Sequence, residues 1–361
     1  MATDIFQRAE RMREDSRYRE ALSAYRKALR AYSQGDDSIG MLCCLLSIGD
    51  TYRMTGNFRG AGDAYTEAIS LSRRMRKKRM RADAMVGLGL SLRALGEWKD
   101  AVRLFSDARG IYEEKSDTEG LAFVLWAEGG AFRVGGDAKK AMHSFRKAYK
   151  LFSSFPDVEH QKATGYCLCG LGGVSRVSGL WDDSLHYYRE ANELLSSLHD
   201  RFGLAYSYCG IGNALRMKGD YAGAMKHLRK AETLYKGIGD IVSYSYTLWS
   251  MAMTHLMKGR LKEAEQCLEK AARRFKTTRD VRGLIYCRLG LGEVLFLRGD
   301  IHDAITAFTR SLDDSRKHDF LIEACHSEAL LNYSTTQKRD SSCYKKIGLR
   351  LTFSPIPFNI P

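Results

Sequence analysis

Arginine recurs along this 361-residue chain at nearly constant intervals, and its spacing is the first sign of a binding surface. Six arginines follow one another at steps of forty or forty-three residues: Arg13, Arg53, Arg93, Arg133, Arg176 and Arg216. A guanidinium offers a rigid fork of donors that binds a carboxylate or phosphate through two hydrogen bonds. Lysine is absent from the column, although a purely solubilising position tolerates either residue. The column therefore predicts a surface that binds acidic groups.

Aromatic residues form a second column with the same spacing. It has five members: Phe123, Tyr166, Tyr206, Tyr246 and Tyr286. Trp126 and Trp249 lie three residues further along, which places them on the same side of a helix. Such rings supply flat, stiff surface for the apolar residues of a ligand. A tyrosine here can equally wedge between neighbouring helices as structure, and the sequence leaves both interpretations open.

The stretch GIGNALRMKG, residues 210–219, has the look of a glycine-rich phosphate loop. A dinucleotide fingerprint needs G-x-G-x-x-G between a strand and a helix. Here Leu215 replaces the third glycine, and nothing before the stretch has the pattern of a strand. The glycines must serve another purpose.

These glycines belong to an internal repeat. A small residue recurs at Ala9, Gly49, Gly89, Gly129, Gly172, Gly212, Ala252 and Gly292. A turn residue follows each of them seven positions later, at Ser16, Gly56, Gly96, Gly136, Gly179, Gly219, Gly259 and Gly299. Small, large and small residues then follow at spacings of four and three, which keeps them on one helical face. Each repeat is thus a helix–turn–helix unit whose small residues permit close packing and whose turn glycine ends the first helix.

In these small, turn-glycine, alanine, aromatic and alanine positions the chain resembles the tetratricopeptide repeat (TPR) family, eight times over residues 2–318. The forty-residue spacing is similar to Pins/LGN-type and kinesin-light-chain-type repeats. So is an aspartate that suits the N-cap of the following helix, found at Asp117, Asp200, Asp240 and Asp280. Pins/LGN repeats typically carry Asn after the packing glycine, whereas only Asn213 does so here. A polarity-adaptor function is therefore not implied.

The resemblance implies an all-α fold, an α-solenoid of about eight stacked TPR units that forms a right-handed superhelix. We expect a solenoid at 1–332 that ends in a capping helix at 319–332, with units near 2–35, 42–75, 82–115, 122–155, 165–198, 205–238, 245–278 and 285–318. Three extra residues near 153–157 include Pro156, which ends a helix and adds flexibility between two halves. Residues 333–361 match no repeat, and we expect a mobile tail there.

In TPR proteins the first helices of successive units line a concave groove that holds the ligand, and the resemblance places both columns there. The candidate peptide-binding residues are Arg53, Arg93, Arg133, Arg176, Arg216, Asn213, Phe123, Trp126, Tyr166, Tyr206, Tyr246, Trp249 and Tyr286. An extended ligand advances about 3.3 Å per residue and packed helices stand about 8–10 Å apart, so acidic residues at every third or fourth position would meet successive arginines. Alternatively, the arginines only cover helix ends with their aliphatic stems.

A basic run, RRMRKKRMR at residues 73–81, lies at the junction of two units and away from the groove. Such runs are usually solvated and occasionally contact nucleic acid or anionic lipid. The net charge of +14 favours acidic partners in general. This run supports an alternative hypothesis, a nucleic-acid-associated or signalling/transcription-regulatory TPR protein that uses its basic surface.

Residue patterns typical of catalysis are missing from the sequence. Neither a nucleophile–base arrangement nor paired carboxylates nor metal-ligand spacing emerges, so we expect no enzyme activity, cofactor or metal. Nine cysteines without disulfide spacing favour free thiols in a reducing cytoplasm. The longest apolar run, residues 41–49, is too short to span a bilayer. Glu128 is anomalous because most equivalent positions are Leu, Ile or Met, and a partly buried carboxylate there needs a partner.

The leading hypothesis is a cytoplasmic, non-enzymatic scaffold or adaptor. Its concave groove would bind an acidic, partly apolar segment of a partner protein. It rests on the arginine and aromatic columns together, and nucleic acid is the alternative partner.

Overall fold

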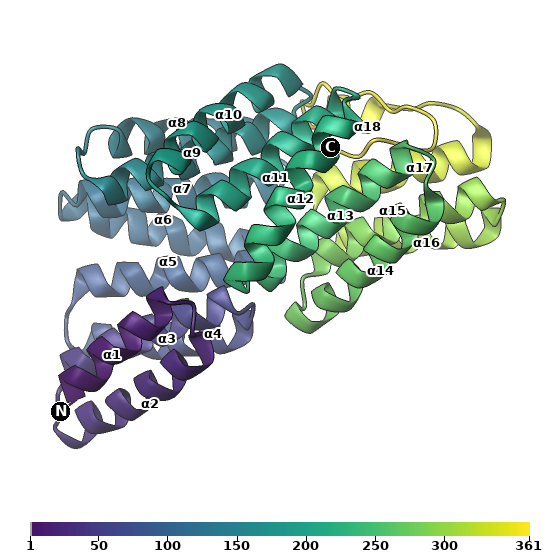
Figure 1. The fold of residues 1–361 in the computed structure, drawn as a ribbon. Helices are drawn as coiled ribbons and strands as arrows, with labels where there is room; N and C mark the ends of the chain where they lie inside the picture. Colours follow the sequence, from purple (N-terminus) through teal and green to yellow (C-terminus); the bar gives the residue numbers. More distant parts are fainter. Residues whose placement is uncertain (1) are drawn as a thin grey trace. The chain divides into compact units, whose positions relative to one another are not determined.

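The computed structural model describes residues 2–361, which form eighteen helices and no strand (Figure 1). Successive helices pair as helix–turn–helix units, so the expected all-α solenoid of TPR-type units is confirmed. The chain divides into two compact units, residues 1–131 and 132–361, and the boundary lies within α7 (Thr118–Val134). The boundary therefore precedes the segment around Pro156 where we expected flexibility.

The first unit contains α1 to α6 and most of α7. The bounds are α1 Ala2–Glu14, α2 Tyr18–Gln34, α3 Ser38–Met54, α4 Phe58–Arg74, α5 Lys78–Leu95 and α6 Trp98–Glu114. Each of α1 to α5 packs against the next helix, and the first helices α1, α3 and α5 also contact one another in order. The repeat thus stacks its odd-numbered helices along one side.

The second unit continues the same pattern from α8 to α18. The bounds are α8 Ala138–Phe152, α9 Val158–Val177, α10 Trp181–Ser197, α11 Arg201–Met217, α12 Tyr221–Ile238, α13 Ile241–Met257, α14 Leu261–Thr278, α15 Val281–Arg298, α16 Ile301–Lys317, α17 Leu321–Thr336 and α18 Ser342–Lys346. The first helices α9, α11, α13, α15 and α17 contact one another in sequence. The turn at Gly136 also lies against Leu321 and Ile322 at the start of α17.

Aspartate side chains cap the first helices as the sequence predicts. The carboxylates of Asp117, Asp200, Asp240 and Asp280 each accept a hydrogen bond from the backbone N–H three residues later, at 2.8 to 3.0 Å. This bond satisfies one of the donors that a helix start leaves free. The turn glycines adopt the left-handed conformation, with φ of +93° at Gly96 and +83° at Gly219.

The helical glycines are packing residues. A Cβ on Gly49 would lie 2.6 Å from the ring of Tyr65, which belongs to the second helix of the same repeat. A Cβ on Gly87, two positions before the next packing glycine, would lie 2.3 Å from the same ring. Gly210 and Gly212 likewise lie against Tyr188 and Leu228. The helical glycines of the GIGNALRMKG stretch therefore make room for large side chains of the second helices. This agrees with the prediction that small residues of the repeat permit close helix packing.

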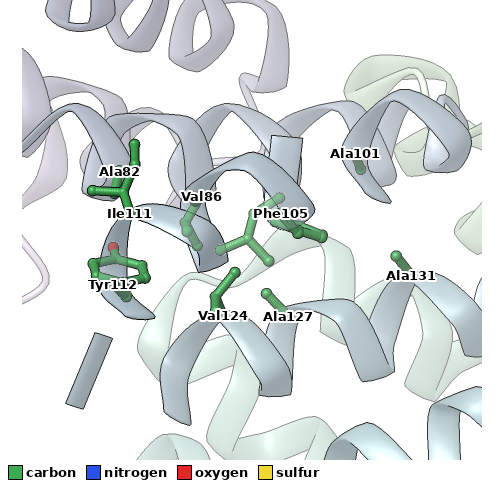
Figure 2. Packing of buried hydrophobic residues seen from close by; sticks show 11 residues of the cluster. Ala82, Val86, Ala101, Phe105, Ile111, Tyr112, Val124, Ala127 and Ala131 are labelled. Atoms are coloured by element: carbon green, nitrogen blue, oxygen red, sulfur yellow. The ribbon is translucent and has the colours of Figure 1, made fainter. Parts of the chain in front are cut away.

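The core of the first unit around α5, α6 and α7 shows how the columns pack. Phe105 and Tyr112 of α6 are almost fully buried among small and branched side chains of the neighbouring helices (Figure 2). Val86 of α5 and Val124 of α7 face this cluster from either side. Alternating large and small residues let the helices interdigitate at the density of a protein interior.

The segment after α17 differs from the mobile tail that we expected. It forms the short helix α18 and then an irregular stretch whose apolar side chains are buried: Leu349, Leu351, Phe353, Ile356, Phe358 and Ile360. A disulfide joins Cys325 of α17 to Cys343 of α18, so the expectation of free thiols is wrong for these two cysteines. The repeat pattern carries no signal for either feature because both lie outside it. Within residues 2–361, every helix is too short or too polar to span a bilayer.

Candidate functional site

The arginines of the first two repeats bind side chains of their own repeat. Arg13 donates to Glu10 at 2.6 Å and to the Tyr25 hydroxyl at 3.2 Å, while Tyr25 donates to Glu10 at 2.6 Å. These hydrogen bonds outweigh the effect of burial and hold the pKa of Glu10 below its ordinary value. In the second repeat Arg53 lies 3.6 Å from Asp50. An acid directly after the packing residue thus engages the arginine locally.

In the third and fourth repeats the arginine lies against the following repeat. A Cβ on Gly130 would be 2.1 Å from Nη1 of Arg93, and one on Gly173 would be 2.3 Å from Nη1 of Arg133. Glycine here replaces the acid of the first two repeats. The same position of the repeat therefore has two structural roles: pairing with an acid of its own repeat, and packing against a glycine of the next repeat.

Buried donors without a partner occur at three arginines of the second unit, Arg133, Arg176 and Arg216, and at Arg53 of the first. Nε of Arg133, and Nε and Nη1 of Arg176, are buried from solvent and make no hydrogen bond. A buried donor that is left unsatisfied costs about 1–3 kcal/mol, and more for a charged group. Both side chains come from first helices, α7 and α9. Arg133 and Arg176 lack both the neighbouring acid that pairs with Arg53 and the tail contacts that hold Arg216, which leaves their donors available to an added carboxylate.

Arg216 of α11 is fully buried and is bound by the tail. Its Nη2 donates to the carbonyl of Ile360 at 2.8 Å, and its Nη1 donates to the side-chain oxygen of Asn359. The Asn359 amide returns a hydrogen bond to the Arg216 carbonyl at 3.0 Å. Burial and the neighbouring Arg176 lower the pKa of Arg216 to about 9, so it stays charged at neutral pH. The partners of this arginine are uncharged, which differs from the acidic ligand expected there.

Asn213 lies beside this network. It donates to the Ser250 hydroxyl at 2.9 Å and accepts from Nη2 of Arg216 at 3.1 Å. The Arg216 guanidinium also stands 5.5 Å from the ring centre of Trp249. The structure thus brings together Asn213, Arg216 and Trp249, three of the candidates.

Glu293 of α15 is a site residue that the sequence did not single out. It is fully buried and accepts a hydrogen bond from the backbone N–H of Phe358 at 2.5 Å. Burial raises its pKa well above the ordinary value, although the Phe358 N–H and Arg216 oppose the shift. It occupies the same repeat position as Asn213. The sequence did carry a signal for Glu293. It is a carboxylate directly after a packing glycine, and in the same repeat Phe296 replaces the arginine of the column.

Two tyrosines of the aromatic column connect neighbouring repeats. The Tyr166 hydroxyl donates to Asp200 at 2.6 Å, and the Tyr246 hydroxyl donates to Asp280 at 3.2 Å. Both aspartates are N-caps of the next first helix. Burial and the neighbouring aspartate raise the pKa of Tyr166 above its ordinary range. These two positions have the structural role that was left open, whereas Tyr206 is half-buried without such a bond.

The remaining aromatic candidates divide between the two units. In the first unit Phe123 stacks on Trp126 at 5.8 Å between ring centres and is 40% exposed. In the second unit Trp249 donates its ring N–H to the carbonyl of Tyr286 at 3.2 Å, and both side chains are buried. In the first pair Phe123 is exposed and Trp126 is half-buried, whereas in the second pair the buried Trp249 ring packs against the Arg216 guanidinium.

Glu128 has the partner that its position requires. Arg109 of α6 donates to its carboxylate at 2.9 Å, and Glu128 itself is 3% exposed. The pair joins α6 to α7 within the first unit. The sequence identified the anomaly but not the partner, because Arg109 has no conspicuous position in the repeat.

The basic run forms a shallow depression at the start of α5. A space of about 320 Å³ is lined by Arg76, Lys77, Lys78, Arg79, Met80 and Lys115. Lys78 is paired with Glu114 at 2.6 Å, and Arg79 with Asp117 at 2.7 Å. Among residues 2–361, no three His, Cys, Asp or Glu side chains are placed to hold a metal ion.

Comparison with known families decides the classification. A tetratricopeptide repeat model matches residues 2–74, 163–237 and 244–317, and a second one matches residues 46–115. The chain belongs to the tetratricopeptide repeat family. The matches cover the repeats of α1 to α6 and those from α9 to α16, but not α7 and α8, and they confirm the TPR pattern read from the small and turn residues. No curated protein sequence matches the chain.

Several solved structures share the fold at low identity. A Rap protein complexed with competence and sporulation factor has a TM-score of 0.61 at 13% identity, covering 93% of this chain and 98% of its own. The Rap conjugation gene regulator of plasmid pLS20, in complex with the Phr* peptide, has a TM-score of 0.63 at 16% identity, covering 75% and 72%. Aspartyl phosphate phosphatase F from Bacillus subtilis has a TM-score of 0.50 at 10% identity, covering 93% and 94%. At these identities the likeness concerns the fold.

Proposed function

We propose that this TPR protein is a non-enzymatic scaffold that binds an extended segment of a partner protein across the first helices of its second unit. The observation that carries the proposal is the tail itself. A non-helical stretch of polypeptide already lies there, with its backbone held by Arg216 and Glu293. Two proteins of similar fold are bound to competence and sporulation factor and to the Phr* peptide, which supports a peptide ligand.

Arg133 and Arg176 would supply the acidic specificity. Their buried donors have no hydrogen-bond partner in the chain, and a carboxylate from the ligand would satisfy them with charge-assisted bonds. The first two arginines of the column, Arg13 and Arg53, are engaged within their own repeats and are left out of the site. The proposed ligand therefore carries acidic residues opposite Arg133 and Arg176 and apolar residues beyond them.

A display library of random peptides tests this function with the full chain as bait. We expect acidic peptides to be enriched, and their binding to fall at least about tenfold in Arg133→Glu/Arg176→Glu, since each charge-assisted bond contributes roughly 1.5–3 kcal/mol. The matched control is Arg146→Glu/Lys147→Glu, which makes the same charge change at exposed positions of α8. Enriched peptides that bind all three proteins equally would refute the site, and a library without enriched peptides would refute the function.

The basic depression in the first unit favours a second candidate, binding of nucleic acid. Five cations line it, although Lys78 and Arg79 are already paired with acidic residues. Binding to duplex DNA would weaken with salt, with a log–log slope of about −0.9 per phosphate neutralised. Replacing the cations of residues 73–81 with glutamine would abolish that binding, whereas a protein whose DNA binding is unchanged by the replacement would exclude the depression.

A further inference from the structure

The tail segment, residues 349–360, packs like a bound peptide. Its buried side chains alternate along the chain, first at Leu349, Leu351 and Phe353 and then at Ile356, Phe358 and Ile360. Thr352 and Ser354 between them are exposed. Each of the two runs has the period of two of an extended chain with one face against a surface, and a bend at residues 355–357 joins them and brings the Phe353 ring within 4.7 Å of the Phe358 ring. The first run therefore presents an apolar face to the solenoid and a polar face to solvent, whereas in the second run the Asn359 side chain also turns to the solenoid and bonds to Arg216.

The tail segment crosses several first helices of the second unit. The N–H of Arg350 donates to the carbonyl of Ser178, just beyond α9, at 3.4 Å. Further on, Phe358 and Asn359 reach Glu293 of α15 and Arg216 of α11. The ring of Phe353 lies 5.6 Å from that of Tyr333 on α17. These contacts come from three repeats and the helix α17, so the tail segment packs on several first helices of the second unit at once.

Polar recognition of the tail segment uses backbone groups and one carboxamide. Arg216 binds the Ile360 carbonyl and the Asn359 side chain, and Glu293 binds the Phe358 N–H. Residues 351–360 contain no charged side chain. The part of the surface around Arg216 and Glu293 is thus fitted to an uncharged, apolar segment with a carboxamide, unlike the open donors of Arg133 and Arg176.

The tail segment is held close to this surface by its own tether. The Cys325–Cys343 disulfide and the contact between His326 and the Tyr344 hydroxyl, 2.8 Å apart, fix α18 to α17. Only Ile347 and Gly348 separate α18 from the tail segment, and Gly348 has a φ of +75°. A short tether gives an effective concentration in the millimolar range. A segment of moderate affinity would therefore occupy the surface most of the time.

We propose that residues 349–360 are a tethered ligand that occupies the Arg216–Glu293 surface until a partner segment of the same chemistry displaces it. That chemistry is a non-helical stretch with apolar side chains at alternate positions, no charged side chain opposite Arg216 and Glu293, and a carboxamide opposite Arg216. The proposal rests on the proposed function, because it assumes that the first helices of the second unit bind partner segments. It adds the class of ligand at this end of the surface and an internal competitor for it.

The probe for the test is a fluorescein-labelled peptide with the sequence of residues 349–360, LRLTFSPIPFNI. Its binding to the full wild-type chain is compared with binding to Phe358→Ala/Asn359→Ala, which removes the Asn359 bonds and one buried ring of the internal segment. The matched control, Thr352→Ala/Ser354→Ala, changes two exposed residues of the same segment. Anisotropy gives the affinities, and far-UV circular dichroism confirms that each variant keeps its helices.

We expect the Phe358→Ala/Asn359→Ala variant to bind the peptide at least about tenfold more tightly than wild type, since a competitor at millimolar effective concentration is weakened. The control should match wild type, and adding Arg216→Ala should abolish the gain. Equal affinity in wild type and variant, or a gain that survives Arg216→Ala, would overturn the proposal.

Hydrogen exchange of the wild-type chain keeps the proposal testable if the variant does not fold. A displaceable segment opens without unfolding the solenoid, so amides of residues 351–360 should exchange at least about tenfold faster than the core amides of α11 and α15. Equal protection of the segment and the two helices would refute displacement. If only the tethered-ligand proposal is wrong, binding of the library peptides still depends on Arg133 and Arg176. If the proposed function is wrong, binding of the library peptides does not depend on these arginines, so the two failures can be told apart.

Discussion

Acid should loosen the join between α17 and α18 through His326. The imidazole is fully buried, with Nδ1 2.8 Å from the Tyr344 hydroxyl and Nε2 without a partner. Glu323 on its own helix, Arg282 on α15 and Arg176 on α9 are the charged groups that act on it. Burial is the largest influence and lowers the pKa of His326 to about 4.

The depressed pKa makes the stability depend on pH in a definite direction. The unfolded chain takes up the proton near the ordinary pKa of about 6.5, and the folded chain does so only near 4. The stabilisation from a neutral His326 is therefore complete above about 6.5 and is lost as pH falls from 6.5 to 4. A difference of about 2.5 pKa units corresponds to about 3 kcal/mol, of which about 2.5 kcal/mol is lost by pH 4.5.

Urea unfolding of wild type and His326→Gln at pH 7.5 and pH 4.5 measures this loss. Other titrating groups affect both proteins alike, so wild type should lose about 2.5 kcal/mol more than the variant between the two pH values. His143→Gln, at an exposed position of α8, serves as the control and should behave as wild type. If His326→Gln loses as much stability as wild type within about 0.5 kcal/mol, the imidazole is not held neutral by burial.

Two further predictions concern packing and the buried carboxyl group. Gly87→Ala should destabilise the first unit by about 1–3 kcal/mol, because its Cβ would meet the Tyr65 ring at 2.3 Å. Gly110→Ala on α6 has open space around its Cβ and should stabilise the first unit by about 1 kcal/mol. Thermal unfolding measures both changes in stability, and equal effects of the two substitutions would contradict the described packing of Gly87. Glu293 has a raised pKa, so the folded chain holds its proton more tightly and the stability contribution declines as pH rises from about 4.3 towards the folded value. Glu293→Gln should remove that decline in urea unfolding between pH 4 and 8, and an unchanged pH profile relative to wild type would show that the carboxyl group is not buried as described.

The repeat fold was predictable from sequence because its packing is local and periodic. Gly49 and Gly212 recur at fixed spacing since a large side chain of the second helix must fit against each of them. Asp200 and Asp280 follow the same rule because each caps a helix that begins at the same point of its repeat. Such features repeat in the sequence, so one copy explains the others.

The candidate site was predictable only in part, because arginines at the same position of the repeat have different neighbours in different repeats. Arg53 and Arg176 occupy the same repeat position, yet Asp50 is present beside the first and Gly173 stands in the equivalent place beside the second. The tail could not be predicted at all, since Asn359 meets Arg216 from 143 positions away and outside any repeat. Long-range contacts of this kind leave no periodic trace in one sequence.

The hydroxyl bonds from Tyr166 to Asp200 and from Tyr246 to Asp280 run from each repeat to the one that follows it. Each bond ties the cap of one first helix to the repeat before it, so neither repeat of the pair can open alone without breaking the bond. We therefore expect the loss of either phenol to loosen the following helix start as well as the tyrosine's own repeat.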